Sequence, residues 1–334
     1  VWCNDRRTTR GLKITHMSVS TFFIRYWLDE IGLRAIVCPC HASILLEVIL
    51  SSCTEQRLIE RFFMTQPTII MVAPNGARKQ KSDHPALPVT IAETVTAAKA
   101  CFDAGASILH AHVRDENGAH VLDAERYISL LDAMRSAVPE MLIQITTEAV
   151  GRYNPQEQAD IVFTVKPDFV SVGFGEMTGD ASANAMAYAR DFYHQAHAQN
   201  IHVQHILYSA ENMASFKRAV ADGILPSGSS GKHHVLLVLG RYAANFQSDP
   251  DDLQHFIKDD LSDFASWSVC AFGYREFDAM QAAIAAGGHC RVGFENNLYL
   301  KDGTLAPDNA ALVRQLAQSC TPATRAETLA LFGN

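Results

Sequence analysis

A (β/α)8 barrel, the TIM-barrel fold, is predicted for this chain of 334 residues from the order and number of its secondary-structure patterns. From Thr68 onward, eight short runs rich in β-branched and apolar residues alternate with amphipathic stretches. This alternation favours parallel strands, and eight such units in about 250 residues is the size of this barrel. The alternative is a doubly wound open sheet, but the turn from Ala73 to Ala77 lacks the G-x-G-x-x-G spacing typical of that fold.

The expected strands span residues 68–73, 107–113, 141–147, 169–173, 202–207, 234–239, 266–270 and 290–294. The expected helices span residues 91–104, 123–138, 155–165, 181–200, 210–222, 250–260, 276–286 and 308–319. Barrel enzymes place their chemistry at the carboxyl ends of the strands, so the residues that follow each strand are the candidates for function.

Two histidines at the end of the second expected strand form the first candidate site. His110 and His112 alternate with Ala111, so both imidazoles should point to the same face of the strand. Imidazole is a good zinc ligand, and catalytic zinc needs three protein ligands and one open position. The alternative is a pair of strand histidines that hydrogen-bond to neighbouring backbone groups.

Glu295, just after the eighth expected strand, is the candidate for a third ligand. In a closed barrel, strand eight lies beside strand one and only one strand away from strand two. The carboxylate of Glu295 could therefore meet the imidazoles of His110 and His112. A salt bridge or a contact at a helix start is the alternative role for this residue.

Composition restricts the class of protein. With 48% hydrophobic and 19% charged residues, the chain resembles a soluble globular enzyme. The net charge of -8 argues against nucleic-acid binding, and no apolar run is long enough to span a membrane. The eight cysteines form no C-x-x-C pair, so we expect reduced thiols and a cytoplasmic location.

The first 63 residues differ from the rest of the chain. They hold four of the eight cysteines, are slightly basic while the remainder is acidic, and show no sustained helical or strand period. We expect residues 1–63 to be an extension outside the fold, with Met64 as the natural start and 64–334 as the catalytic barrel. A small helical appendage is the alternative.

Several segments together resemble the family of β-keto acid cleavage enzymes. They are A-P-N-G-A, D-H-P-A-L-P-V-T, A-G-A-S-I-L-H-A-H-V-R-D, V-L-G and G-G-H-C-R-V-G-F-E-N-N, and the resemblance runs from about Thr68 to the C-terminus. It implies a zinc-dependent barrel that reacts a β-keto acid with acetyl-CoA to give acetoacetate and a new acyl-CoA. A homo-oligomer, either a dimer or a tetramer, is also expected.

The resemblance also implies roles for individual residues. His110, His112 and Glu295 would be the zinc ligands, Arg291 would lie near the catalytic acid/base, and Thr146 would contact the substrate.

Asn296 departs from the pattern, because the usual acid/base is an Asp at this position and a neutral amide cannot take a proton. Glu148, Glu176 or a zinc-bound hydroxide could replace it, or the reaction could be slow or altered.

Other departures concern the substrates. Asn75 and Arg78 follow the first strand and are expected to bind substrate. Where aminohexanoate-cleaving members carry acidic groups for an ammonium, Arg78 favours a carboxylate or phosphate instead, although it could also be a surface residue. Gly240 and Arg241 begin the loop after strand six, which we expect to lie near the thioester of the acyl-CoA.

Two other functions compete with this interpretation. A metal-dependent amidohydrolase also uses an H-x-H pair in a barrel, but after the first strand, with further ligands from the middle strands and an Asp after the eighth. A catalytically altered barrel that binds a metal and a keto acid or acyl-CoA without turnover is the second, and Asn296 is its only support. A different metal-dependent C–C lyase is a further alternative within catalysis.

Removing residues 1–63 should leave a folded, metal-binding barrel, because the regular pattern begins at Thr68. Cooperative thermal unfolding and metal content of a chain that starts at Met64 would be compared with those of the full chain. Loss of cooperative unfolding in the shorter chain would show that the extension is part of the core.

Overall fold

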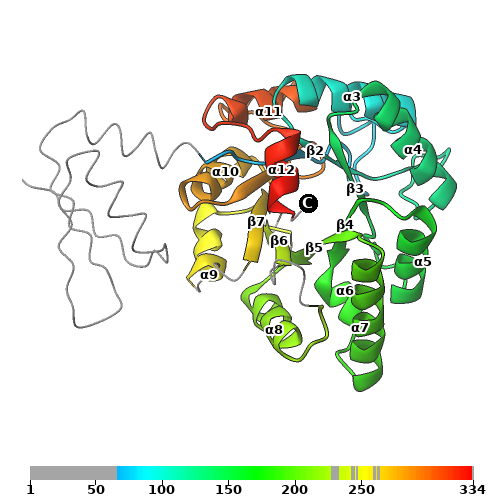
Figure 1. Cartoon of the computed structure of the whole chain (residues 1–334). Coiled ribbons are helices and arrows are strands. Elements are labelled where there is room, and N and C mark those ends of the chain that lie inside the picture. Colours follow the sequence, from blue (N-terminus) through cyan, green and yellow to red (C-terminus); the bar gives the residue numbers. More distant parts are fainter. Residues whose placement is uncertain are drawn as a thin grey trace, which may run out of the picture. The chain divides into compact units, whose positions relative to one another are not determined.

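The computed structural model describes residues 66–226, 233–241, 245, 247–258, 261 and 264–332. Its eight strands form a closed barrel in chain order, all of them parallel, with β8 paired to β1. They are β1 Ile70–Val72, β2 Ile108–Ala111, β3 Leu142–Thr146, β4 Phe169–Gly173, β5 His202–Leu207, β6 His233–Leu239, β7 Phe264–Ala271 and β8 His289–Val292. The predicted (β/α)8 fold is confirmed, and Figure 1 shows helices surrounding the strands.

The helices are α3 Ile91–Asp103, α4 Ala124–Ala137, α5 Pro155–Val165, α6 Phe174–Thr178, α7 Ala183–Ala198, α8 Ala210–Ala221, the 3-10 turn η2 Pro250–Leu253, α9 Gln254–Ile257, α10 Glu276–Ala285, α11 Asn309–Ala317 and α12 Arg325–Leu331. The short helices α6 and α12 are absent from the sequence prediction. Residues 250–260 were expected to form one helix, and the structure has η2 followed by the four-residue α9.

Local sequence explains where the helices begin. Thr90 caps α3 and Asn154 caps α5, each in a capping box whose glutamate bonds back to the cap residue. Pro155 occupies the first turn of α5, where a missing backbone N–H costs nothing.

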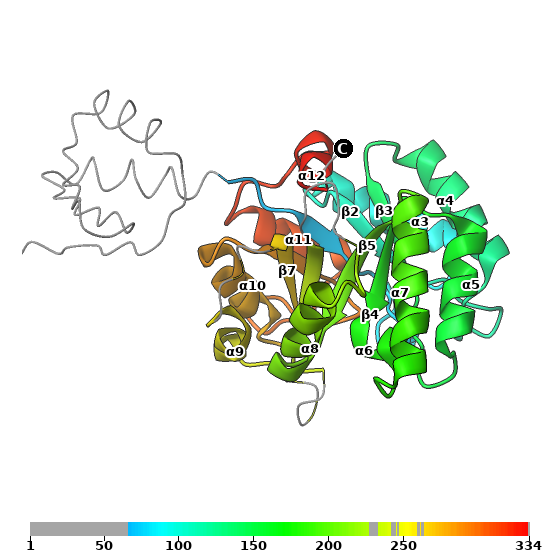
Figure 2. The same cartoon turned by 60° about the horizontal axis from the view of Figure 1, so that its bottom comes forward.

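Apolar side chains pack in two regions of the barrel, one between the strands and the helices and one at the amino end. Residues such as Leu109 and Ala111 face outward into the main core beneath the helices. A smaller cluster fills the amino end of the barrel, where Phe332, just after α12, packs on the rings of Phe169 and His234. Figure 2 shows α12 at one end of the barrel. The amino end of the barrel is thus closed by packed apolar and aromatic side chains.

The predicted extension, residues 1–63, lies outside the described residues. In the part of the chain that the structure describes, no helix is both long and apolar enough to cross a membrane.

Candidate active site and metal centre

The two histidines of the predicted metal site lie at the end of β2, His110 within the strand and His112 directly after it. Ala111 belongs to the outer core, whereas the imidazoles of His110 and His112 point into the barrel, as the alternation along a strand requires. Both side chains are buried, and their Nε2 atoms are 3.2 Å apart.

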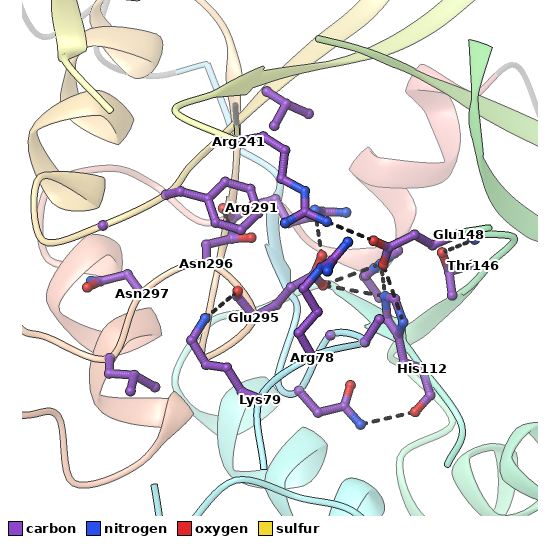
Figure 3. Close-up of a pocket in the computed structure, with 18 of the residues that line it drawn as sticks. Arg78, Lys79, His112, Thr146, Glu148, Arg241, Arg291, Glu295, Asn296 and Asn297 are labelled. Carbon is purple, nitrogen blue, oxygen red and sulfur yellow. Dashed lines mark hydrogen bonds and ion pairs between the residues drawn. The ribbon is translucent and has the colours of Figure 1, made fainter. Parts of the chain in front are cut away.

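Glu295 completes a group of three ligands. Because β1 pairs with both β8 and β2, the loop after β8 lies close to the end of β2. Oε2 of Glu295 is 3.6 Å from Nε2 of His110 and 3.6 Å from Nε2 of His112 (Figure 3). Among the residues described, these three form the one group of histidine, cysteine or acidic side chains close enough to hold a metal ion.

The geometry of the three ligand atoms fits a single divalent ion. Tetrahedral zinc with bonds of about 2.0–2.2 Å keeps its ligand atoms roughly 3.3–3.6 Å apart. The separations here are 3.2, 3.6 and 3.6 Å. Oε2 of Glu295 is buried and accepts no hydrogen bond from the described residues, which is costly for a carboxylate oxygen. An ion among these atoms would satisfy it.

Hydrogen bonds select the tautomer of His110 that can bind a metal. Nδ1 of His110 lies 2.8 Å from Oε1 of Gln144 on β3, whose own Nε2 donates to Oε1 of Gln204 at 3.1 Å. An amide oxygen only accepts, so Nδ1 carries the proton and Nε2 keeps its lone pair. Burial, followed by the charge of Arg291, lowers the pKa of His110 to about 4, so the ring is neutral at pH 7.

Arg291 on β8 holds one oxygen of the Glu295 carboxylate. Its Nη2 donates to Oε1 of Glu295 at 3.1 Å, and Nζ of Lys79 donates to the backbone oxygen of Glu295 at 2.7 Å. Burial by itself would raise the pKa of Glu295, but the surrounding positive groups, Arg291 foremost and Lys79 and Arg241 with it, together outweigh burial, and the pKa lies below its usual value. Glu295 is therefore ionised, with Oε2 directed to the histidines.

The loop that carries Glu295 is fixed by buried polar groups. Oε1 of Glu276, at the start of α10, accepts from the backbone N of Gly293 at 3.3 Å. Oδ1 of Asn309, at the start of α11, accepts from the backbone N of Phe294 at 2.8 Å. Gly293 has φ +138°, and a Cβ there would clash with the backbone oxygen of Ala73. Only glycine fits this turn.

A cavity of about 380 Å³ adjoins the metal ligands, within the usual size range of small-molecule sites. Seven other predicted site residues line it, namely Asn75, Arg78, Thr146, Glu148, Arg241, Arg291 and Asn296. The structure therefore brings most of the predicted residues into one place.

Two of these lining residues also bond to the strands that carry the site. Asn75 donates from Nδ2 to the backbone oxygen of His112 at 3.0 Å. Oγ1 of Thr146 accepts from the backbone N of Glu148 at 3.1 Å.

Glu148, two residues after the end of β3, is the second acidic side chain that lines the cavity, beside Glu295. Its Oε1 accepts from Nη2 of Arg241 at 3.2 Å, and its Oε2 is 3.9 Å from Nδ1 of His112. Burial and then the negative charge of Glu295 raise the pKa of Glu148 to about 7. A carboxyl group with this pKa can both accept and release a proton near neutral pH.

Asn296 is buried and serves as a hydrogen-bond donor. Its Nδ2 donates to the backbone oxygen of Arg291 at 3.2 Å, and its side chain also bonds to Glu276. Both partners accept hydrogen bonds. The surroundings of residue 296 therefore suit a hydrogen-bond donor such as an amide N–H and not a carboxylate.

Glu176 and Gly240 do not line the cavity. Glu176 lies on α6, the helix that the sequence did not predict, and its Oε2 accepts from Nε2 of Gln158 at 2.8 Å and from the backbone N of Ala149 at 3.2 Å. Gly240 has φ +76°, and a Cβ there would lie 2.6 Å from the backbone N of Ser248. Their placement gives no support to the predicted catalytic role of Glu176 or to direct cofactor contact by Gly240.

Several site residues were missed by sequence reasoning. Gln144 could have been found, because the parallel register places it directly beside His110. Lys79, Glu276 and His120 come from loops or helix ends, where no strand or helix period indicates the direction of a side chain.

Fold and site together define a class of protein: a (β/α)8 barrel with side chains able to hold a metal ion beside a cavity at the carboxyl ends of its strands. The sequence model of the beta-keto acid cleavage enzymes matches residues 67–329. The chain belongs to the β-keto acid cleavage enzyme family.

Individual relatives agree with this assignment. The chain is 29% identical to 3-oxoadipate:acetyl-CoA acetyltransferase of Cupriavidus necator, over 81% of this chain and 96% of the relative. It is also 29% identical to 3-keto-5-aminohexanoate cleavage enzyme of Acetoanaerobium sticklandii, over 75% of this chain and 90% of the relative. Among solved structures, apo ObcA matches in fold, with a TM-score of 0.59 and 14% identity over 75% of this chain and 66% of ObcA.

Replacing both His110 and His112 by alanine should abolish metal retention while the barrel still folds, because the ligands lie at the strand ends outside the apolar core. Metal content would be measured after dialysis, alongside the far-UV circular dichroism spectrum. His289→Ala, at the amino end of the barrel, is the matched control and should keep its metal. Full metal occupancy in the double variant would contradict the assignment.

Proposed function

We propose that this protein is a zinc-dependent acyltransferase that cleaves a β-keto acid with acetyl-CoA, giving acetoacetate and a new acyl-CoA. The observation that carries the proposal is the buried triad of His110, His112 and Glu295, with the ligand spacing of a single ion beside a cavity. Membership of the family and the names of its relatives support the reaction class. Two imidazoles and a carboxylate with an open position are a typical donor set for catalytic zinc.

The bound metal would supply a Lewis-acid charge that favours the enolate form of a β-keto acid. Arg291 and Lys79 keep Glu295 in place through its Oε1 and its backbone oxygen. Asn75 ties the loop after β1 to the backbone of His112. These contacts arrange the ligand atoms before substrate arrives, so little reorganisation is needed on binding.

Glu148 is the proposed acid/base. Arg241 holds its Oε1, which leaves Oε2 on the side of the metal ligands to take a proton from the substrate carbon and to return it. The raised pKa, about 7, suits this exchange. Thr146, two residues earlier at the end of β3, accepts from the backbone N of Glu148 and lines the same cavity, where it would contact the substrate.

Arg241 marks the side of the cavity where we place the thioester. Its guanidinium lies over the ring of Phe272, 5.4 Å from the ring centre, and both residues line the cavity. The predicted homo-oligomer and cytoplasmic location stay predictions of the sequence.

The competing functions differ in what they require. The amidohydrolase arrangement needs its histidine pair after the first strand, but here the pair lies at the end of β2. The non-catalytic binding protein is favoured by the donor role of Asn296. A steady-state assay with acetyl-CoA and a panel of β-keto acids decides between binding and turnover, with acetoacetate as the measured product. Bound metal without acetoacetate from any keto acid would overturn the proposed function.

The acid/base assignment predicts a loss of turnover for one substitution and no gain for another. Glu148→Gln should lower kcat by about 10²–10⁴-fold, the usual contribution of a positioned acid/base. Asn296→Asp should not raise kcat, because a carboxylate there would face the acceptor oxygens of Arg291 and Glu276. Metal content of each variant would be measured together with its turnover.

Glu176→Gln is the matched control, since it removes a buried carboxylate that does not line the cavity. A gain in turnover for Asn296→Asp, or a larger loss for Glu176→Gln than for Glu148→Gln, would show that the base is not Glu148.

A further inference from the structure

The loop between β1 and α3 is pressed against the metal ligand Glu295. Gly76 has φ +60°, and a Cβ there would clash with Cγ of Glu295. The buried guanidinium of Arg114 donates to the backbone oxygens of Asn75, Gly76 and Lys79. The residues that follow Gly76 therefore have a fixed backbone position beside the metal centre.

Arg78 extends from this loop into the cavity (Figure 3). Within the described part of the chain, no acidic side chain lies within ion-pair distance of it. Arg241 and Arg291, in contrast, pair with Glu148 and Glu295 at 3.2 and 3.1 Å.

The balance of charge in the cavity favours an anionic ligand. Four basic side chains line it, Arg78, Lys79, Arg241 and Arg291, against the two carboxylates Glu148 and Glu295. A divalent ion would add two positive charges. The one carboxylate of a simple β-keto acid, separated from the keto group by a single methylene, would leave this excess only partly neutralised, so there is room for a second negative group.

We propose that Arg78 forms an oxyanion subsite and that the substrate is a β-keto acid with a second, terminal carboxylate. The guanidinium can bind a carboxylate through two parallel hydrogen bonds. This subsite depends on the proposed acyltransferase function and specifies which class of β-keto acid the enzyme would accept.

The phosphates of acetyl-CoA are the other source of such an anion. Arg78 lines the same cavity as Glu148 and the three metal-binding side chains. The pantetheine arm of CoA separates the phosphates from the thioester, so they would lie outside this region while the thioester is at the metal.

The test compares three six-carbon β-keto acids that differ in charge beyond the keto group: 3-oxoadipate with a second carboxylate, 3-oxohexanoate with an uncharged alkyl end, and 3-oxo-5-aminohexanoate with an ammonium on C5. For the native protein, kcat/KM should be highest for 3-oxoadipate. Arg78→Gln should reduce the preference for 3-oxoadipate over 3-oxohexanoate by about 10–100-fold, the effect of one charge-assisted contact, and Arg78→Lys should retain part of it.

Lys81→Gln is the control for general electrostatics, because it removes one positive charge from the same loop. Lys81 pairs with Glu93 at 2.7 Å and does not line the cavity. Its substitution should leave the substrate preference unchanged.

Turnover of all three keto acids without a preference, or an Arg78→Gln effect confined to the KM for acetyl-CoA, would overturn the subsite but not the proposed function.

If no keto acid is turned over, the proposed function fails, and calorimetric binding of 3-oxoadipate and 3-oxohexanoate to the metal-loaded protein still decides the subsite. Equal affinity for both would overturn it, and tighter binding of 3-oxoadipate that Arg78→Gln removes would support it.

A separate observation concerns His112, whose Nδ1 lies 3.3 Å from Nδ1 of a third buried histidine, His120. Nε2 of His120 lies 3.1 Å from the backbone oxygen of Glu148. A carbonyl oxygen only accepts, so Nε2 of neutral His120 carries its proton and Nδ1 of His120 accepts. Nδ1 of His112 must then donate, which leaves the lone pair of His112 on Nε2, facing the metal site.

We infer that His120 is a positioning residue that holds His112 in its metal-binding tautomer. It does for His112 what Gln144 does for His110. His120 does not line the cavity, so it acts through His112 alone. Partners of this kind typically change metal affinity by about 10–100-fold.

Zinc affinity, measured by competition with a chelator, tests this role in the full chain. His120→Phe keeps a ring but loses the acceptor and should weaken zinc binding by about 10–100-fold. His120→Asn places an amide oxygen near the position of Nδ1 and should restore most of the affinity. His289→Phe, whose imidazole accepts from the backbone N of Ile69 at the far end of the barrel, controls for loss of a buried histidine.

Native affinity in His120→Phe would overturn the inference, as would equal loss in the Phe and Asn variants. Long-range proton–nitrogen correlation spectra of protein labelled with ¹⁵N-histidine provide a second measurement that needs no variant. They should show the Nδ1–H tautomer for His112 in the metal-free protein at pH 7, and the Nε2–H tautomer would contradict the role of His120.

Discussion

Closure of the barrel between β8 and β1 is the constraint on which the site depends. Met71 pairs with Arg291 across this seam, and the same strand pairs with β2 on its other side. Glu295 thereby reaches the two imidazoles of β2 from the far end of the chain. Side chains alternate faces along a strand, so a shift of one residue at the seam would turn Arg291 out of the barrel and move Glu295 away from the histidines.

The seam also concentrates buried charge, which must be compensated. Glu295 is held by Arg291 and Lys79, and Nη2 of Arg114 donates to backbone oxygens of the loop after β1. Breaking a buried pair of this kind leaves an uncompensated charge and is strongly destabilising. The network thus links the stability of the loops after β1 and β8 to the position of the ligand atoms. Gly76 and Gly293 have no Cβ, which lets these two loops contact each other closely.

Burial has different consequences for the two acidic groups in the cavity. Glu295 is beside Arg291 and stays ionised, whereas Glu148 faces the negative charge of Glu295 and has a pKa near 7. Two carboxylates with such different environments can divide the work of binding a metal and moving a proton. In the proposed mechanism Glu148, just after β3, moves the proton. Asn296, in the loop after β8, then needs no carboxylate and can serve as a hydrogen-bond donor.

The sequence by itself determined the fold and much of the site. Alternating strand and helix patterns predicted eight parallel strands, and the order of strands around a barrel then brought His110, His112 and Glu295 together. These inferences succeed because strand periodicity fixes the face of a side chain and the fold fixes the neighbours of each strand.

Tertiary structure alone decided the roles that depend on loops and helix ends. The short helix α6 takes Glu176 out of the cavity, while Lys79 and His120 enter the site from loops with no period to indicate their direction. Glu148 accepts from Arg241, a partner far away in the chain. Local sequence pattern does not encode such partners, because they are chosen by packing after the barrel has closed.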